Sequence, residues 1–204
     1  MAESIYGVYE ENLIKIKENL EKRFEEYQQV IYKKTGDKAF EHMAVRIKSN
    51  ESMREKCTRK GLPQTAESAL SKIKDAIGFR IICPFVEDVF AIVEYIRSFD
   101  DSEIIAEKDY IRHAKPNGYR SYHIILAVHT DYPDVLGNEQ GIYYAEFQIR
   151  TIAMDTWAAL EHKLKYKKNI PNEALLVAEL KKVADELASC DLSLQTIREL
   201  IEQA

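Results

Sequence analysis

The chain has 204 residues, with 29 Lys and Arg against 34 Asp and Glu, a formal net charge of −5 and a pI near 5.7. Apolar residues make up 46% and charged residues 31%, which excludes a disordered or fibrous chain. Domains average about 150 residues, so we expect one domain, spanning 1–204, with helical flanks. No apolar run reaches the roughly 18 residues of a membrane span, and no secretory signal opens the chain, so we expect a cytoplasmic protein without a membrane partner. The acidic balance argues against DNA as a partner, and the three scattered cysteines argue against a disulfide framework or structural zinc.

Apolar periodicity predicts the secondary structure in chain order. A long helix is expected over about residues 6–34, and a stretch rich in cations and poor in apolar residues follows over 42–62. The further expected elements are a helix over 66–77, a strand over 79–83, a helix over 86–98, a mixed strand over 103–111, strands over 122–129 and 142–149, a helix over 151–168 and a helical segment over about 172–203. This order predicts an α+β fold, in which helices flank a mixed central β-sheet and long helices stand at both ends.

The basic stretch locally reverses the sign of the acidic chain. Only Glu51 and Glu55 offset its six cations, which are Arg46, Lys48, Arg54, Lys56, Arg59 and Lys60. Guanidinium forks and ammonium charges bind phosphate oxygens directly, so this density suits a polyphosphate. A solvated helix face with salt bridges explains the stretch about equally well.

Two polar clusters stand beside predicted strands. Asp75 follows a helical pattern and precedes a strand, where a carboxylate suits Mg²⁺, although a local salt bridge would also explain it. A loop with Gly118 delivers Tyr119 and His123 at the start of the strand over 122–129. An aromatic ring beside cations suits a nucleobase and its phosphates, which we favour over a simple hairpin turn.

A third cluster lies on the strand over 142–149. Glu146 and Gln148 share one face of this strand, while its other face is apolar. A strand carboxylate that faces a cationic pocket can hold a metal or accept a proton from a hydroxyl nucleophile. The solvent face of an antiparallel sheet would give the same pattern.

Taken together, these stretches resemble the small alarmone synthetases, the single-domain members of the RelA/SpoT (p)ppGpp synthetase family. The resemblance covers about residues 40–168, the core of the expected domain, and rests on five motifs in chain order. The motifs are Arg46-Ile-Lys48-Ser-x-x-Ser52-x-x-x-Lys56, Lys74-Asp75-x-x-Gly78-x-Arg80, Asn117-Gly-Tyr-Arg-Ser-x-His123, Glu146-x-Gln148-x-Arg150-Thr151, and Trp157 with Glu161-His162. The family often has Asp-Ile-Ala-Gly in the second motif, where this chain has Asp75-Ala-Ile-Gly78.

The resemblance implies a nucleotidyltransferase-like synthetase fold and a GTP pyrophosphokinase activity. Such an enzyme transfers pyrophosphate from ATP to the ribose 3′-hydroxyl of GDP or GTP, with Mg²⁺ as cofactor and AMP released. By resemblance, Asp75 and Glu146 hold the metal, and Glu146 is also the base toward the 3′-hydroxyl. The implied ATP-binding residues are Arg46, Lys48, Ser52, Lys56, Arg59 and Arg80, with Arg46 and Arg80 sandwiching the adenine. The implied GDP- or GTP-binding residues are Arg112, Lys115, Tyr119, His123, Gln148 and Arg150, with Tyr119 stacked on the guanine.

The resemblance also implies a homotetramer built through the terminal helices. No stretch resembles the hydrolase domain of the long enzymes, so we expect synthesis without degradation. Regulation by RNA is not evident in the residues, and they do not decide between GDP and GTP.

Four other functions stay open. A toxin-like relative would pyrophosphorylate the 3′ end of tRNA, which needs a basic surface that an acidic chain does not suggest. A second enzyme of this kind would make the adenosine analogue. A nucleotide-binding regulator without turnover would have no need of both Asp75 and Glu146. A helical interaction module would leave the polar clusters unexplained.

Overall fold

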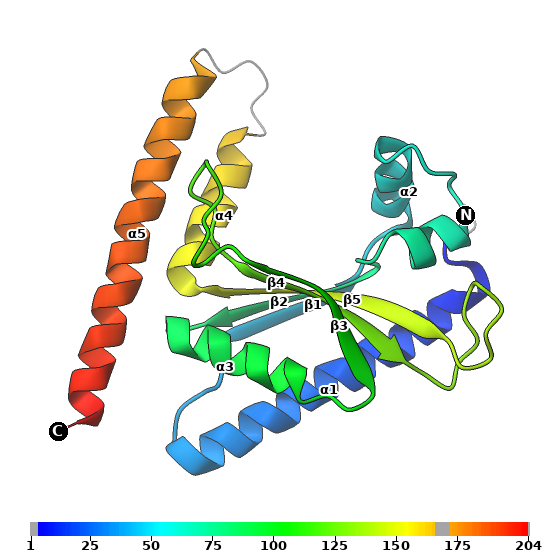
Figure 1. Cartoon of the computed structure of the whole chain (residues 1–204), viewed down its shortest axis with the longest axis horizontal. Helices are drawn as coiled ribbons and strands as arrows, with labels where there is room; N and C mark the ends of the chain where they lie inside the picture. The colour runs from blue at the N-terminus through cyan, green and yellow to red at the C-terminus, as the bar shows by residue number, and fades with distance from the viewer. Residues whose placement is uncertain (1–3, 166–171, 204) are drawn as a thin grey trace.

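A mixed five-stranded sheet forms the centre of the computed structural model, which describes residues 4–165 and 172–203 (Figure 1). The strands are β1 (His42–Ile47), β2 (Ile77–Cys83), β3 (Ser102–Asp109), β4 (Tyr122–His129) and β5 (Ile142–Thr151), in the spatial order β1-β2-β5-β4-β3. β2 and β5 are parallel, and the other neighbouring pairs are antiparallel. The predicted α+β class with a mixed central sheet is confirmed.

The helices divide between the two faces of the sheet. They are α1 (Glu10–Thr35), α2 (Asn50–Arg59), α3 (Val86–Arg97), α4 (Ile152–Lys165) and α5 (Glu173–Glu202), with the 3-10 turn η1 (Gly7–Tyr9) and the short π-helix η2 (Ser68–Lys72). In Figure 1, α1 and α3 lie under one face, whereas α2 stands at one end of the opposite face and α4 with α5 at the other end. Within the described residues, no helix is long and apolar enough to cross a membrane.

The core lies between the sheet and the pair α1 and α3. α1 buries residues at spacings of three and four, and its fully buried Phe24 packs against Phe79 of β2 and Phe147 of β5 with ring centroids 6.0 and 5.7 Å away. The rings of Phe79 and Phe147 stack on each other at 4.6 Å. Because side chains alternate along a strand, the residues next to these phenylalanines point to the opposite face of the sheet. The helix-covered face therefore serves packing, and the opposite face is left for chemistry.

Most predicted elements are present, but the helix expected over 66–77 is right only for its first half, residues 66–72. Helical structure ends with η2 at Lys72, Ile73 has extended backbone angles, and Ile77 begins β2, where it pairs with Ile47 and Ala145. The apolar residues of this segment are buried because it enters the sheet, so tertiary pairing overrides the helical period. The end of the helix expected over 151–168 lies outside the described residues beyond Lys165.

β1 lies in the cation-rich stretch over 42–62, where no strand is expected. Its apolar residues Met43, Val45 and Ile47 alternate with Ala44 and Arg46, which is the period of a strand with one covered face. The dense cations that follow in α2 hide this short alternation when the whole stretch is considered together. The sheet expected from the sequence therefore lacks the edge strand β1.

Candidate functional site

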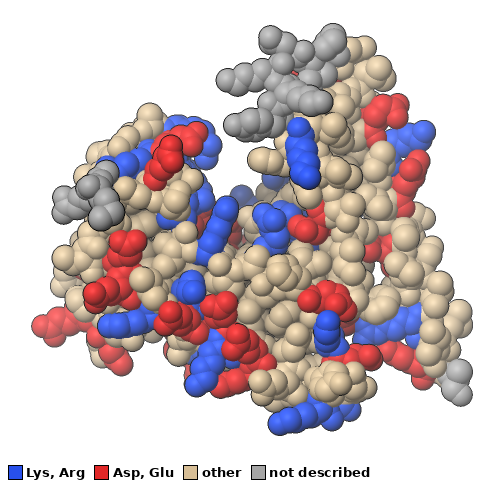
Figure 2. All heavy atoms as spheres, turned by 180° about the vertical axis from the view of Figure 1, so that it is seen from behind, with Lys and Arg blue, Asp and Glu red and all other residues tan. Residues whose placement is uncertain are grey.

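The uncovered face of the sheet carries a cavity of about 220 Å³. Figure 2 shows a deep notch between the lobe that contains α2 and the lobe that contains α4 and α5, with Lys and Arg atoms along its walls. The cavity is lined by residues of β1, β2 and β5 and of the segments beside them: Ala44, Val45, Arg46, Lys48, Asp75, Gly78, Phe79, Arg80, Glu146 and Gln148. Most of the ATP and metal residues implied by the resemblance thus meet in one place.

Strand register brings these side chains together. In the parallel pair, Gly78 lies opposite Glu146 and Arg80 lies opposite Gln148, while Arg46 of β1 lies opposite Gly78 from the other side. Gly78 has no side chain, so the floor between Arg46 and Glu146 stays open. A Cβ added at Gly78 would meet only the Arg46 carbonyl oxygen among the described atoms, at 4.0 Å, so the protein itself has room for it.

Asp75 is the electrostatic centre of the cavity. Its Oδ2 accepts hydrogen bonds from Lys48 Nζ, at 3.1 Å, and from Lys56 Nζ. Burial by itself would raise the pKa of the Asp75 carboxyl, but the bond from Lys56 and the charge of Lys48 outweigh burial and hold this pKa below its usual value. The other oxygen, Oδ1, is buried and has no hydrogen-bond partner among the described residues. An anionic oxygen therefore remains available to a ligand.

α2 presents the basic stretch to this carboxylate. Ser49 caps the helix by accepting a bond from the backbone nitrogen of Ser52 at 3.3 Å, and Lys56 lies four residues further on the same helix face. Arg59 is the last residue of the helix and is exposed, outside the residues that line the cavity. The structure therefore brings Lys48 and Lys56 to Asp75, whereas Ser52 and Lys56, like Arg59, are not among the residues that line the cavity.

Tyr119 is the centre of a second group of polar residues. Its hydroxyl accepts a bond from Arg150 Nη2 at 2.7 Å and lies 2.8 Å from His123 Nε2. The Tyr119 hydroxyl and Nε2 share one hydrogen bond, and its direction depends on which imidazole nitrogen carries the proton. Nδ1 lies 3.8 Å from Glu146 Oε1. His123 therefore stands between the Tyr119 ring and the carboxylate of Glu146.

The charge state of His123 follows from its surroundings. Burial, followed by the positive charges of Arg150, Lys115 and Lys108, lowers the pKa of His123 from 6.5 to about 4. The ring is therefore neutral near pH 7. It offers hydrogen bonds to a ligand, but no positive charge to a phosphate.

A chain of hydrogen bonds joins the two groups. Arg150 Nη2 also donates to Gln148 Oε1 at 3.0 Å, and Gln148 Nε2 donates to Glu146 Oε2 at 3.1 Å. Arg150 is buried, and its Nη1 donates to Asp155 of α4 at 3.1 Å. With these donors engaged inside the protein, Arg150 orients Tyr119 and Gln148. Sequence reasoning missed Asp155, which only proximity to Arg150 identifies.

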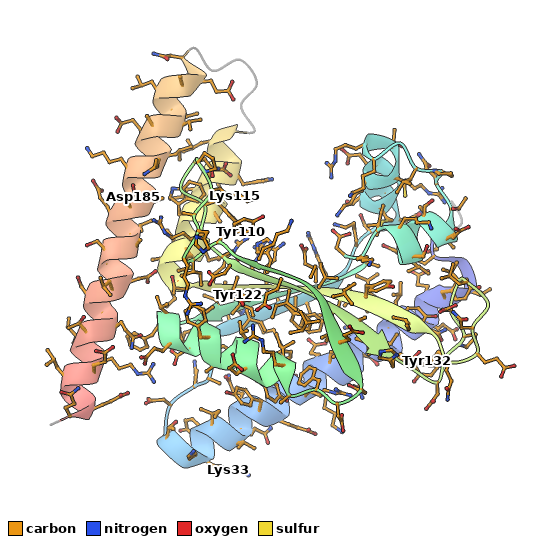
Figure 3. The ribbon with its side chains drawn as sticks, in the orientation of Figure 1. Lys33, Tyr110, Lys115, Tyr122, Tyr132 and Asp185 are labelled. Atoms are coloured by element: carbon orange, nitrogen blue, oxygen red, sulfur yellow. The ribbon has the colours of Figure 1, made fainter. Side chains whose placement is uncertain are left out.

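The loop that carries Tyr119 is shaped by α5. Gly118 has a positive φ of 91°, and a Cβ at this position would lie 2.5 Å from the Ala184 Cβ. Arg120 forms an ion pair with Asp185 at 3.1 Å. Figure 3 shows Lys115 and Tyr110 beside α4, with Asp185 on the part of α5 that lies next to them. The Lys115 ammonium lies 4.8 Å from the centre of the Tyr119 ring.

Other residues of the motifs have structural roles or point elsewhere. Asn117 donates from Nδ2 to Glu161 of α4 at 3.2 Å, which ties the loop to that helix. Trp157 is buried and its indole nitrogen donates to the Leu180 carbonyl of α5, so this motif residue packs α4 against α5. Arg112 pairs with Asp109 and lies over the Phe90 ring of α3 at 4.6 Å. The structure thus directs Arg112 to the helix-covered side of the sheet, away from the Tyr119 group.

The chain is similar to known proteins in both sequence and fold. Residues 45–171 match the family described as "Region found in RelA / SpoT proteins". The chain is 43% identical over 150 residues to GTP pyrophosphokinase YwaC of Bacillus subtilis (strain 168), an overlap that covers 74% of this chain and 70% of that protein. The crystal structure of small alarmone synthetase 1 from Bacillus subtilis, bound to its product pppGpp, has a TM-score of 0.74 at 30% identity and covers 95% of this chain and 94% of that one. The same synthetase bound to AMPCPP has a TM-score of 0.69 at 26% identity, over 96% of this chain and 95% of that one.

The chain therefore belongs to the RelA/SpoT family, and within it to the small alarmone synthetases. The resemblance found in the five motifs is confirmed.

The neutral His123 predicts how stability depends on pH. The unfolded chain has an ordinary histidine pKa of 6.5 and the folded chain a value of about 4, so between these values the unfolded chain binds more protons. This group therefore lowers the free energy of unfolding as the pH falls from 6.5 towards 4. His123→Gln, which does not titrate, should reduce this slope in urea unfolding across the range. His113→Gln is the control, because His113 is exposed in the same part of the chain. An unchanged slope in His123→Gln would contradict the prediction.

Proposed function

We propose that the cleft holds ATP and GDP or GTP side by side and transfers pyrophosphate from ATP to the ribose 3′-hydroxyl of the acceptor. The products are the alarmone (p)ppGpp and AMP, so the chain is a GTP pyrophosphokinase. Its family and its relatives support this activity. The observation that carries it is the hydrogen-bonded connection of Tyr119, through Arg150 and Gln148, to Glu146 in the same cavity as Asp75.

The β1–β2 side of the cavity is the proposed ATP site. Four cations (Arg46, Lys48, Lys56 and Arg80) stand against two carboxylates (Asp75 and Glu146), a local charge of +2 in a chain of net charge −5. Arg46 and Arg80 occupy diagonal positions on adjacent strands with Gly78 between them. Long side chains at such positions can meet, so the two planar guanidinium groups suit the faces of an adenine. Lys48, Ser52 and Lys56 would then hold the phosphates, with Arg59 at the outer end.

The donor set fits Mg²⁺. Within residues 4–165 and 172–203, no three His, Cys, Asp or Glu side chains gather as a metal site. Mg²⁺ does not need such a cage, because one or two carboxylates together with substrate phosphates complete its coordination. The buried, unpartnered Oδ1 of Asp75 and the carboxylate of Glu146 in the same cavity are the groups that would hold it. When bound, the ion would neutralise charge on the transferred phosphates.

The Tyr119 group is the proposed acceptor site. Tyr119 offers an aromatic face for guanine, Lys115 beside it offers a charge for the acceptor phosphates, and His123 offers a neutral ring for hydrogen bonds. Gln148 completes the wall toward Glu146, and Arg150 fixes Tyr119. Arg112 would reach this site only after its contacts with Asp109 and Phe90 break.

Glu146 is the proposed general base. A ribose hydroxyl is a poor nucleophile, and a carboxylate within hydrogen-bond reach can take its proton as the bond to phosphorus forms. Gln148 occupies Oε2, so Oε1, on the side of His123, is the oxygen that would receive the proton. The reaction forms a bond from the 3′-oxygen to the β-phosphorus of ATP and breaks the bond from that phosphorus to the oxygen of AMP.

The 3′ end of tRNA is not favoured as the acceptor, because the relatives are GTP pyrophosphokinases. We place the reaction in the cytoplasm, which contains its nucleotide substrates.

We also propose a homotetramer, which the outer surface of α5 supports. Leu192, Leu200 and Ile201 are 68%, 63% and 70% exposed, an unusual amount of uncovered apolar surface on one helix. Light scattering should give a mass of four times 23.6 kDa. The mass of a single chain would contradict the proposal.

Transfer of label tests the reaction. With γ-labelled ATP and Mg²⁺, label should move to GDP or GTP. Asp75→Asn and Glu146→Gln should each lower kcat by about a thousandfold, because each removes a charge that acts at the reacting phosphates or hydroxyl. Glu25→Gln, an exposed carboxylate on α1 at the opposite face of the sheet, should keep full activity. Label on tRNA and none on GDP or GTP would overturn the proposal.

The open floor at Gly78 tests the ATP site separately. Gly78→Ala places a methyl group where the protein has room, so the free energy of unfolding should stay the same or rise slightly. The methyl group intrudes on the proposed nucleotide, so KM for ATP should rise by about tenfold while KM for the acceptor stays unchanged. Steady-state kinetics with each substrate varied in turn measures both constants. An ATP KM equal to that of the wild type would place the nucleotide elsewhere.

A further inference from the structure

The segment before α1 reaches the ATP side of the cleft. Tyr6 is only 1% exposed, and its hydroxyl donates a hydrogen bond to the Lys48 carbonyl oxygen at 2.7 Å. These residues are 42 positions apart in the chain. A buried tyrosine hydroxyl needs a partner, and here the partner is the backbone of a residue that lines the cavity.

Lys48 occupies the junction between β1 and α2. Its backbone nitrogen donates to the Ala76 carbonyl at 2.8 Å, its ammonium binds Asp75, and the next residue, Ser49, caps α2. The bond from Tyr6 fixes the remaining polar group of the Lys48 backbone. The backbone nitrogen, the backbone carbonyl and the side chain of Lys48 are then all held at once.

The same segment also holds the first residue of α2. The Ile5 backbone nitrogen donates to Asn50 Oδ1 at 2.8 Å, and Arg54 Nε donates to that oxygen at 3.0 Å. The segment therefore contacts the chain on both sides of Ser49. This fixes where α2 begins and, with it, the positions of Ser52 and Lys56.

We propose that Tyr6 is a positioning residue for ATP, which holds the β1–α2 junction in the conformation that presents Lys48 and the first turns of α2 to the phosphates. This inference rests on the proposed function, because it takes ATP as the ligand of this side of the cleft. Cations that are held in place before binding lose less conformational freedom when the phosphates arrive, so affinity rises. The Tyr119 group is built from the loop before β4 and from β4, β5 and α4, and within the described residues no hydrogen bond joins it to Tyr6. The effect should therefore be confined to ATP.

A pair of matched variants tests the role. Tyr6→Phe keeps the buried ring and removes only the hydroxyl. Tyr143→Phe is the control, because Tyr143 is also 1% exposed and its hydroxyl donates to a backbone carbonyl, that of Pro133, at 2.6 Å. Pro133 lies in the connection between β4 and β5, away from the cavity-lining residues. The Tyr143 hydroxyl also accepts a bond from Asn12 Nδ2 at 2.9 Å, so Tyr143→Phe loses two hydrogen bonds and should lose at least as much stability as Tyr6→Phe.

Only Tyr6→Phe should change substrate binding. We expect its KM for ATP to rise about fivefold, an effect of the size of one lost hydrogen bond, with kcat and KM for GDP or GTP within about twofold of the wild type. An unchanged ATP KM in Tyr6→Phe, or an equal rise in Tyr143→Phe, would show that the hydroxyl is merely structural and would overturn the inference.

Binding of AMPCPP, measured by calorimetry, separates this inference from the proposed function. A wild type that binds AMPCPP but transfers no label would overturn the proposed reaction. In that case, weaker binding by Tyr6→Phe alone would still support the positioning role, and equal binding by all three proteins would overturn it.

Discussion

The parallel pairing of β2 with β5 is the constraint on which the site depends. It sets Gly78 beside Glu146 and Arg80 beside Gln148. It also brings Asp75, which lies just before β2, to the same cavity. The register is secured from the other face of the sheet, where the aromatic rings of β2 and β5 stack under α1. A slip of one residue would turn the polar side chains into this core, so packing on one face determines the geometry of chemistry on the other.

Charged side chains are distributed differently on the two halves of the cleft, the β1 side and the β4 side. On the β1 side, Lys48 and Lys56 share one oxygen of Asp75 and leave the other oxygen available. On the β4 side, burial and then the surrounding cations lower the pKa of His123 and keep it neutral, and the positive charge is concentrated on Lys115 and on the internally bonded Arg150. Glu146 belongs to both halves, which is the position required of a group that acts where the donor and the acceptor meet.

Segments near the two ends of the described chain support opposite halves of the cleft. The turn before α1 holds the β1–α2 junction through Tyr6, and α5 shapes the Tyr119 loop through the close approach of Ala184 to Gly118 and the ion pair of Asp185 with Arg120. Neither terminal helix supplies a residue that lines the cavity. Their contribution is to hold two separate walls at fixed positions on one rigid sheet.

The sequence by itself determined the class of the sheet, the strand over 122–129, both long terminal helices and the motif residues, because periodicity and motif spacing are local properties of the chain. The tertiary structure alone decided what depends on pairing and proximity. β1 pairs with β2, helical structure ends at Lys72 before β2 begins, and Arg112 lies over Phe90 of α3 rather than beside Tyr119. Tyr6 contacts Lys48 across 42 positions, and no local pattern reports such a contact. Local sequence patterns determine which helices and strands form. The register of the sheet and the packing of distant segments determine which side chains come into contact.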